Sequence, residues 1–152
     1  MTGSELIVRV LLEGAIGALV MVAVAFLLSR FVGDGVGRSL LVILLLVAAG
    51  AYFGFAVMAR VGPAWLLVEL AHCFLFGAMA LRGLRGSPYW LAAGWALHPV
   101  WDFGLHYVGP GTFAPWPYTI ACISFDLIVA AYVALVYGLI GPRRLGLRND
   151  ER

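Results

Sequence analysis

The chain has 152 residues, of which 63% are hydrophobic and 12% are charged, and its formal net charge is +2. Soluble domains are nearer half apolar and a quarter charged, so this composition excludes an ordinary soluble protein. The basic residues are few and dispersed, which leaves no basic surface of the kind that binds nucleic acids. We therefore predict an integral membrane protein that has membrane lipid, and no nucleic acid, as its partner.

Five apolar segments follow one another along the chain, and each is long enough for a transmembrane helix of about 20 residues. Stretches that contain glycine and proline separate these segments. We expect an all-α, polytopic membrane bundle that forms a single transmembrane domain over residues 1–152. Its helices are predicted at about residues 6–31, 39–60, 64–84, 88–107 and 118–140, and a basic tail follows at 142–152.

The arginines are distributed unevenly between the two ends of this predicted bundle. With five spans, one side receives only Arg9 and Arg60, whereas the other receives Arg30, Arg38, Arg82, Arg85, Arg143, Arg144, Arg148 and Arg152. Short basic loops stay on the cytoplasmic side of a membrane. This asymmetry predicts that the N-terminus is outside and that the C-terminus is cytoplasmic.

Seven ionisable residues interrupt the predicted spans, although each costs about 2.5–3.5 kcal/mol at the centre of a membrane helix on insertion scales. They are Glu13, Glu69, His72, His98, Asp102, His106 and Asp126. At a rise of 1.5 Å per residue, Glu69 lies about 8 Å and Asp126 about 13 Å below the outer end of its helix. The set therefore gathers in the outer half of the bilayer, either as a functional site or as a structural polar network.

Helical spacing places several of these residues on common faces. Glu69 and His72 are three residues apart, and His98, Asp102 and His106 follow one another at intervals of four. At 100° per residue the latter three span about 80° of the helix surface, so they form one stripe that should face the bundle interior. His98 and His106 are about 12 Å apart along the axis, which makes it hard for both to bind one ion.

Mixed ligation by histidine and carboxylate groups suits zinc, iron or manganese. We predict a divalent metal ion, with zinc favoured, iron second and heme as a further cofactor. The candidate ligands are His72, His98, His106, Glu69, Asp102 and Asp126. Asp102 and Glu69 are also the candidate catalytic carboxylates. Participation of Glu13, Cys73 and Cys122 is left open.

The predicted function is that of a membrane-embedded, hydrolase-like metalloenzyme that acts on a lipid or small apolar substrate at the outer half of the bilayer. One alternative is a di-iron or heme protein with a redox or binding role, because a Glu-x-x-His pair is typical of di-iron helix bundles. Another alternative is a proton or divalent-cation transporter, although the apolar inner halves of the helices provide no exit path. A homodimer is also considered, since five helices are few to enclose a site.

The stretch from Gly94 to Asp102 reads Gly-Trp-Ala-Leu-His-Pro-Val-Trp-Asp and is followed by His106. It resembles the Gly-Trp-x-x-His-x-x-Trp-Asp…His motif of an uncharacterised family of small bacterial integral membrane proteins. Further likenesses over about residues 48–132 are Gly50-Ala51-Tyr52, Glu69, and Cys122 with Asp126. The resemblance implies a multi-pass protein of the bacterial inner membrane and names no activity.

The chain departs from that family pattern at two positions. The family has a His-His pair where this chain has Leu105-His106, and an apolar residue at the position of His72. The resemblance therefore favours Glu69, His98, Asp102, His106 and Asp126 as the site. A looser similarity, of chemistry alone, links the chain to alkaline ceramidase and adiponectin-receptor-like hydrolases, which hold zinc between helices with histidine and aspartate.

Overall fold

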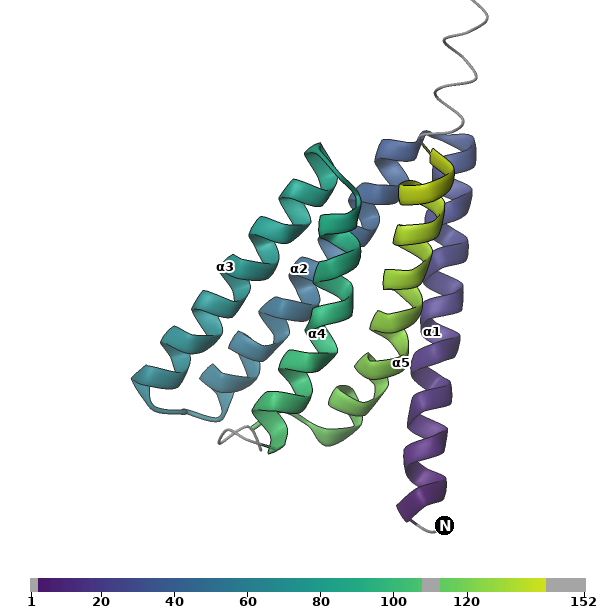
Figure 1. Cartoon of the computed structure of the whole chain (residues 1–152). Coiled ribbons are helices and arrows are strands. Elements are labelled where there is room, and N and C mark those ends of the chain that lie inside the picture. The colour runs from purple at the N-terminus through teal and green to yellow at the C-terminus, as the bar shows by residue number, and fades with distance from the viewer. Residues whose placement is uncertain (1–2, 108–112, 142–152) are drawn as a thin grey trace, which may run out of the picture.

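The structure is a computed structural model that describes residues 3–107 and 113–141, and for residues 106 and 107 it describes only the backbone. The described chain forms five α-helices in an up-and-down order (Figure 1). They are α1 (Gly3–Phe31), α2 (Asp34–Met58), α3 (Pro63–Arg85), α4 (Tyr89–Tyr107) and α5 (Trp116–Tyr132), and α5 continues as the π-helical turns of η1 (Val133–Ile140). The predicted all-α architecture with five helices is thereby confirmed.

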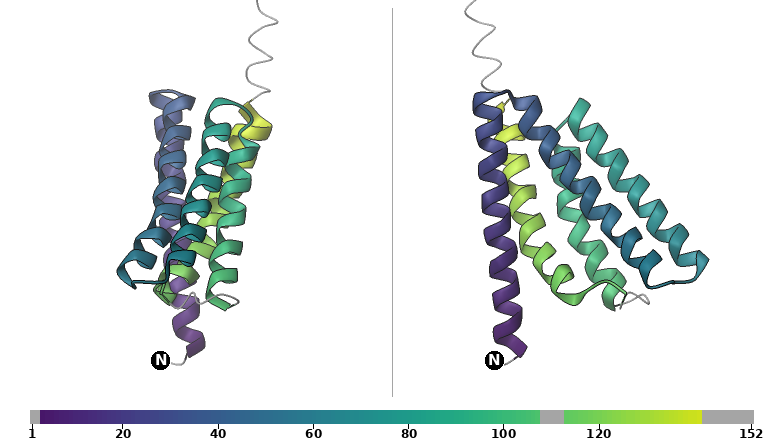
Figure 2. Two further views of the ribbon diagram at one scale, coloured as in Figure 1. Left: turned by 90° about the vertical axis from the view of Figure 1, so that its left-hand side faces the viewer. Right: turned by 180° about the vertical axis from the view of Figure 1, so that it is seen from behind.

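The helices pack in a ring in which each contacts the next along the chain and α5 returns to contact α1. α2 and α4 also approach each other across this ring. Seen from behind and from the side, α1 and α5 run close together, while α2 and α3 lean away from them towards the end that holds the start of α1 (Figure 2). The turn between α2 and α3, the end of α4 and the start of α5 lie at that same end, which we call the N-terminal end (Figure 1).

Four of the five helices are long and apolar enough to cross a membrane: α1, α2, α3 and the continuous helix Trp116–Ile140. These four candidate transmembrane helices indicate a multi-pass membrane protein. α4 has only 19 residues and is less apolar, because it contains His98, Pro99, Asp102 and His106. The prediction of five spans is therefore supported for four helices, and the side of the membrane that each end faces stays a prediction.

The second helix begins at Asp34, earlier than the predicted start near residue 39. The glycine-rich stretch after Phe31 was expected to form a linker up to residue 38. In the structure, Gly33 makes most of the turn, with a φ of 147°. A side chain is disfavoured in this conformation, whereas glycine adopts it readily. Gly35 and Gly37 therefore continue the helix instead of breaking it.

The bundle interior is divided along its length. An apolar core occupies the half near the turn between α1 and α2, where Leu41, Leu45, Leu91, Val129 and Val133 are fully buried. The buried ionisable side chains among the described residues lie in the other half, towards the N-terminal end. They are Glu69, His72, His98, Asp102 and Asp126.

Candidate metal centre

α4 presents two different faces, and the polar one points into the bundle. Leu97, Val100 and Phe103 are 48%, 63% and 56% exposed, which suits a face turned towards lipid. His98 and Asp102, on the opposite face, are fully buried. The predicted inward stripe is confirmed for these two residues, whereas the side chain of His106 lies outside the described residues.

Four side chains from α4 and α5 converge in the polar half of the bundle. His98, Asp102, Cys122 and Asp126 each offer a ligand atom, and these atoms all lie within 4.8 Å of one another. The His98 imidazole is central to the group: its Nδ1 is 2.9 Å from Asp126 Oδ2 and 3.6 Å from Asp102 Oδ2. All four residues are buried, so this group could hold a metal ion.

The distances suit a compact, four-coordinate site. Zinc bonds of about 2.0–2.3 Å in a tetrahedron separate neighbouring donor atoms by about 3.3–3.7 Å. The two distances from His98 Nδ1 lie close to this range, and the limit of 4.8 Å leaves about an ångström of adjustment for the widest pair. Side-chain rotation alone can supply such a movement, because both carboxylates and the thiol are on flexible χ angles.

Several polar atoms at the centre have no partner within the protein. Both carboxylate oxygens of Asp102 and Nε2 of His98 are buried without a hydrogen bond. The Tyr52 hydroxyl has Asp102 and Thr119 among its polar neighbours, but it too lacks a contact of hydrogen-bond geometry. A buried polar group without a partner costs about 1–3 kcal/mol, and more when it is charged. A cation bound by Asp102 would remove the part of this cost that belongs to its carboxylate.

A second polar pair, from α3, lies beside this centre. Glu69 and His72 are fully buried, and Nδ1 of His72 is 3.5 Å from Oε2 of Glu69. The four polar side-chain atoms of this pair make no hydrogen bond in the structure. The His72 ring stacks on Trp101 at a centroid distance of 4.5 Å, and its centroid lies 5.7 Å from that of His98. The structure thus brings the pair next to the four-residue group but not into it.

Glu13 and Cys73 lie outside the four-residue donor group. Glu13 is exposed on α1, where its Oε1 accepts a hydrogen bond of 2.9 Å from Nε of Arg9. Cys73 donates its thiol to the carbonyl oxygen of Ala49 at 3.4 Å. Cys122, in contrast, faces the candidate ligands. Its position four residues before Asp126 placed it on the right face, and the family resemblance included it, but a buried thiol is as typical of apolar packing as of metal binding.

The fold and the buried donor group together define a multi-pass helical membrane protein with a potential metal site. The chain belongs to DUF6010, a family of unknown function, which it matches over residues 13–139. The sequence predicted membership of an uncharacterised family of membrane proteins. This prediction is confirmed in two respects: DUF6010 has no assigned function, and four helices of the described chain are apolar enough to span a membrane. No curated protein and no solved structure matches the chain.

Proposed function

We propose that the protein is a membrane-embedded metalloenzyme that hydrolyses a lipid or small apolar substrate at a single zinc ion. The observation that carries this proposal is the convergence of His98, Asp102, Cys122 and Asp126 inside an otherwise apolar bundle. Five buried ionisable residues are expensive in such a bundle and are retained where they have a function. A zinc ion at this position would supply a nucleophilic water at neutral pH.

The chemistry of the donors favours zinc over other divalent cations. A thiolate is a poor ligand for magnesium or calcium, whereas zinc accepts sulfur, imidazole and carboxylate donors together. Asp102, Asp126 and the Cys122 thiolate would also bring three negative charges to the ion, which favours a divalent cation over a monovalent one. Iron remains the second choice, since imidazole and carboxylate ligands suit it as well.

His98 is proposed to bind the metal through Nδ1, which faces both carboxylates. The backbone carbonyl of Ala48 is a neighbour of the His98 ring, although Nε2 makes no hydrogen bond of good geometry in the structure. In the metal-bound protein, Nε2–H would donate to this carbonyl, because ligating histidines commonly donate their second N–H to such a group. That bond would fix both the tautomer and the ring orientation.

Four protein donors are one more than a catalytic zinc site usually keeps. His98, Asp102 and Cys122 would be the three main donors to the ion, and Asp126 would also serve as the general base, since a carboxylate can accept the proton of the attacking water. That proton would pass to the leaving alcohol or amine by way of Glu69 and His72, which lie beside His98. Glu69 thus keeps the catalytic role expected from the sequence.

The location of the polar residues argues against a transport function. A transporter needs polar groups along a path to both sides of the membrane. The buried ionisable side chains of the described chain are confined to the half near the N-terminal end, and the other half holds the apolar core. With the arginine asymmetry, this arrangement supports a one-sided site that faces the outside of a bacterial inner membrane.

Elemental analysis of the detergent-purified protein tests the metal first. We expect near-stoichiometric zinc in the wild type and in Glu13→Gln, which alters an intramembrane carboxylate away from the centre, and loss of zinc in Asp102→Ala. Absence of zinc and iron from the wild type, even after incubation with each metal, would overturn the proposal. Hydrolysis is tested next on a panel of ester and amide lipids in mixed micelles; a zinc-loaded protein that cleaves none of them would remove the hydrolase assignment.

A further inference from the structure

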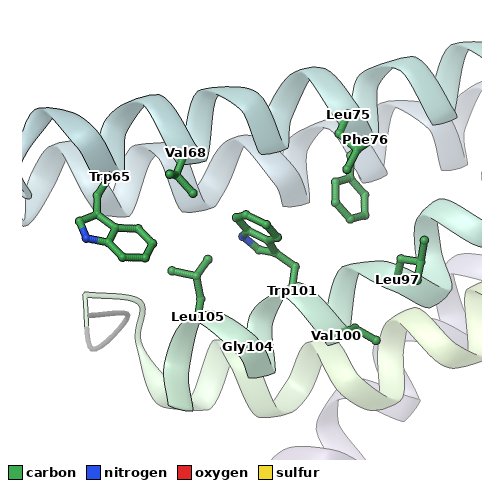
Figure 3. A pocket seen from close by; sticks show the side chains of 9 residues that line it. All are labelled: Trp65, Val68, Leu75, Phe76, Leu97, Val100, Trp101, Gly104 and Leu105. Carbon is green, nitrogen blue, oxygen red and sulfur yellow. The ribbon is translucent and has the colours of Figure 1, made fainter. Parts of the chain in front are cut away.

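Two cavities approach the buried polar residues from different sides. The larger, of about 600 Å³, lies between α3 and α4 and is lined by apolar and aromatic side chains such as Trp65, Val68 and Val100. Figure 3 shows that Trp101 and Phe76 project into the space between these two helices. Both aromatic rings contact His72, at centroid distances of 4.5 Å. The larger cavity therefore ends at an aromatic wall and does not include a donor of the candidate metal centre.

The smaller cavity, of about 260 Å³, lies between α1, α2 and α5 and does include donors. Cys122 and Asp126 are part of its lining, together with Tyr118 and apolar residues from α1, α2, α4 and α5. Val47, at its edge, is 62% exposed, so the cavity opens on the outer surface of the bundle. The cavity forms because α1 packs against both α2 and α5, while the backbones of α2 and α5 do not approach each other.

The composition of the smaller cavity defines the molecule that fits it. Its walls include apolar side chains such as Leu44 and Phe125, which suit a hydrocarbon chain. Its polar side chains include the two metal donors and Tyr118, whose hydroxyl donates to the Ala48 carbonyl oxygen. A ligand that matches both features has an unbranched apolar chain with a metal-coordinating group at one end. The mouth opens on the surface that the bilayer covers in a membrane protein, where such amphiphiles are found.

We propose that this cavity is the substrate site, and that it binds the acyl chain of a lipid whose carbonyl group reaches the metal on the Cys122 and Asp126 side. This inference rests on the proposed metal centre and names its substrate class and its direction of entry. The larger cavity between α3 and α4 is then not the route to the metal, since Trp101 and Phe76 stand between it and the donors.

Two substitutions can fill the two cavities separately. Val47 lines the smaller cavity from α2 and is exposed at its mouth, so Val47→Trp would occupy part of its volume. Gly104 lines the larger cavity from α4, and a Cβ atom built there meets nothing within 4 Å, so Gly104→Leu would fill that cavity without a backbone clash. The second variant is a matched control, because each variant adds apolar bulk to the lining of one cavity.

The experiment uses the cobalt(II)-loaded protein in detergent, whose visible spectrum reports on ligands that reach the metal. Acetohydroxamate and octanohydroxamate bind metals through the same group and differ only in their alkyl chains. Each methylene that the protein buries improves affinity about fourfold, and a comparison between variants cancels the partition of the longer probe into micelles. We expect Val47→Trp to weaken the binding of octanohydroxamate at least tenfold and to leave that of acetohydroxamate within twofold of the wild type. Gly104→Leu should change neither affinity.

The possible results separate this inference from the metal centre itself. Equal octanohydroxamate affinities in the wild type and Val47→Trp, or a selective loss in Gly104→Leu, would overturn the assignment of the smaller cavity while cobalt binding persists. Failure of the wild type to bind cobalt would overturn the proposed metal centre, and the substrate site with it. An unchanged cobalt spectrum in each unliganded variant verifies that the substitution has left the centre intact.

Discussion

His98 and Asp126 join the middle of α4 to the middle of α5 through a contact of 2.9 Å between Nδ1 and Oδ2, and both side chains are buried. The same pair lies at the heart of the candidate metal centre. Asp126→Asn keeps the shape of the side chain and an oxygen that can accept the hydrogen bond, but it removes the negative charge. We expect this variant to fold normally and to bind zinc at least tenfold more weakly, because even the loss of a partner outside the ligand shell costs about 10- to 100-fold.

Competition with a chromophoric chelator measures that affinity directly. Glu13→Gln is the control, because it removes a carboxylate of α1 that is exposed and paired with Arg9. Zinc affinity in Asp126→Asn equal to that of the wild type would show that Asp126 has no role in binding the ion.

Cys122 provides a spectroscopic test of the ligand set. The wild-type protein loaded with cobalt(II) should show a thiolate-to-cobalt charge-transfer band in the near ultraviolet, and Cys122→Ser should abolish it. Cys73→Ser is the matched control, since Cys73 bonds to the Ala49 carbonyl and is not part of the donor group. A band that survives in Cys122→Ser and disappears in Cys73→Ser would contradict the proposed ligands.

Glu69 separates metal binding from turnover. If Glu69 and His72 move protons and do not bind the ion, Glu69→Gln should keep its full zinc content and lose activity by about 10²-fold or more, in keeping with the usual contribution of a general acid–base group. Zinc analysis and the lipid-cleavage assay on the same preparation check both parts. Loss of zinc in Glu69→Gln would instead assign Glu69 to the metal, as the sequence analysis predicted.

Much of the candidate site follows from helical periodicity. The spacing of four residues between His98 and Asp102 placed both on one face, and the cost of ionisable groups in lipid required that face to be buried, as it is. Glu13 shows where this reasoning stops: its depth matched that of the other residues, but its direction around α1 could not be judged without knowing which face contacts α5. The participation of Cys122 in the site was left open for a related reason, because a thiol is as compatible with an apolar core as with a metal.

The fold was predictable at the level of whole helices, since length and apolarity determine the spans. The turn between α1 and α2 was not, because three glycines between residues 32 and 38 looked equally able to break a helix. Only tertiary contacts distinguish them: Gly33 makes the turn, whereas Gly37 is buried where α2 contacts α1. Which glycine has which role depends on neighbours that are distant in the sequence.

We therefore predict that replacing Gly37 by alanine lowers the stability of the protein, whereas the same change elsewhere in a helix usually raises it. Glycine to alanine within a helix ordinarily stabilises by about 0.5–1 kcal/mol. A Cβ atom at Gly37, however, would clash with Ser29 Oγ and the Ala25 carbonyl oxygen, and would crowd the hydroxyl of Tyr137. It would also disturb the 2.6 Å hydrogen bond between the Ser29 and Tyr137 hydroxyls. We expect Gly37→Ala to destabilise the protein by about 1–3 kcal/mol, as overpacking commonly does.

Gly50→Ala is the matched control, because Gly50 is also inside α2 and a Cβ atom there meets nothing within 4 Å. It should stabilise the protein slightly or leave its stability unchanged. Unfolding of the two variants in detergent, followed by circular dichroism, compares them directly. If Gly37→Ala were as stable as Gly50→Ala, the close approach of α2 to α1 at this position would be wrong, and with it the role of Gly37 in packing α2 against α1.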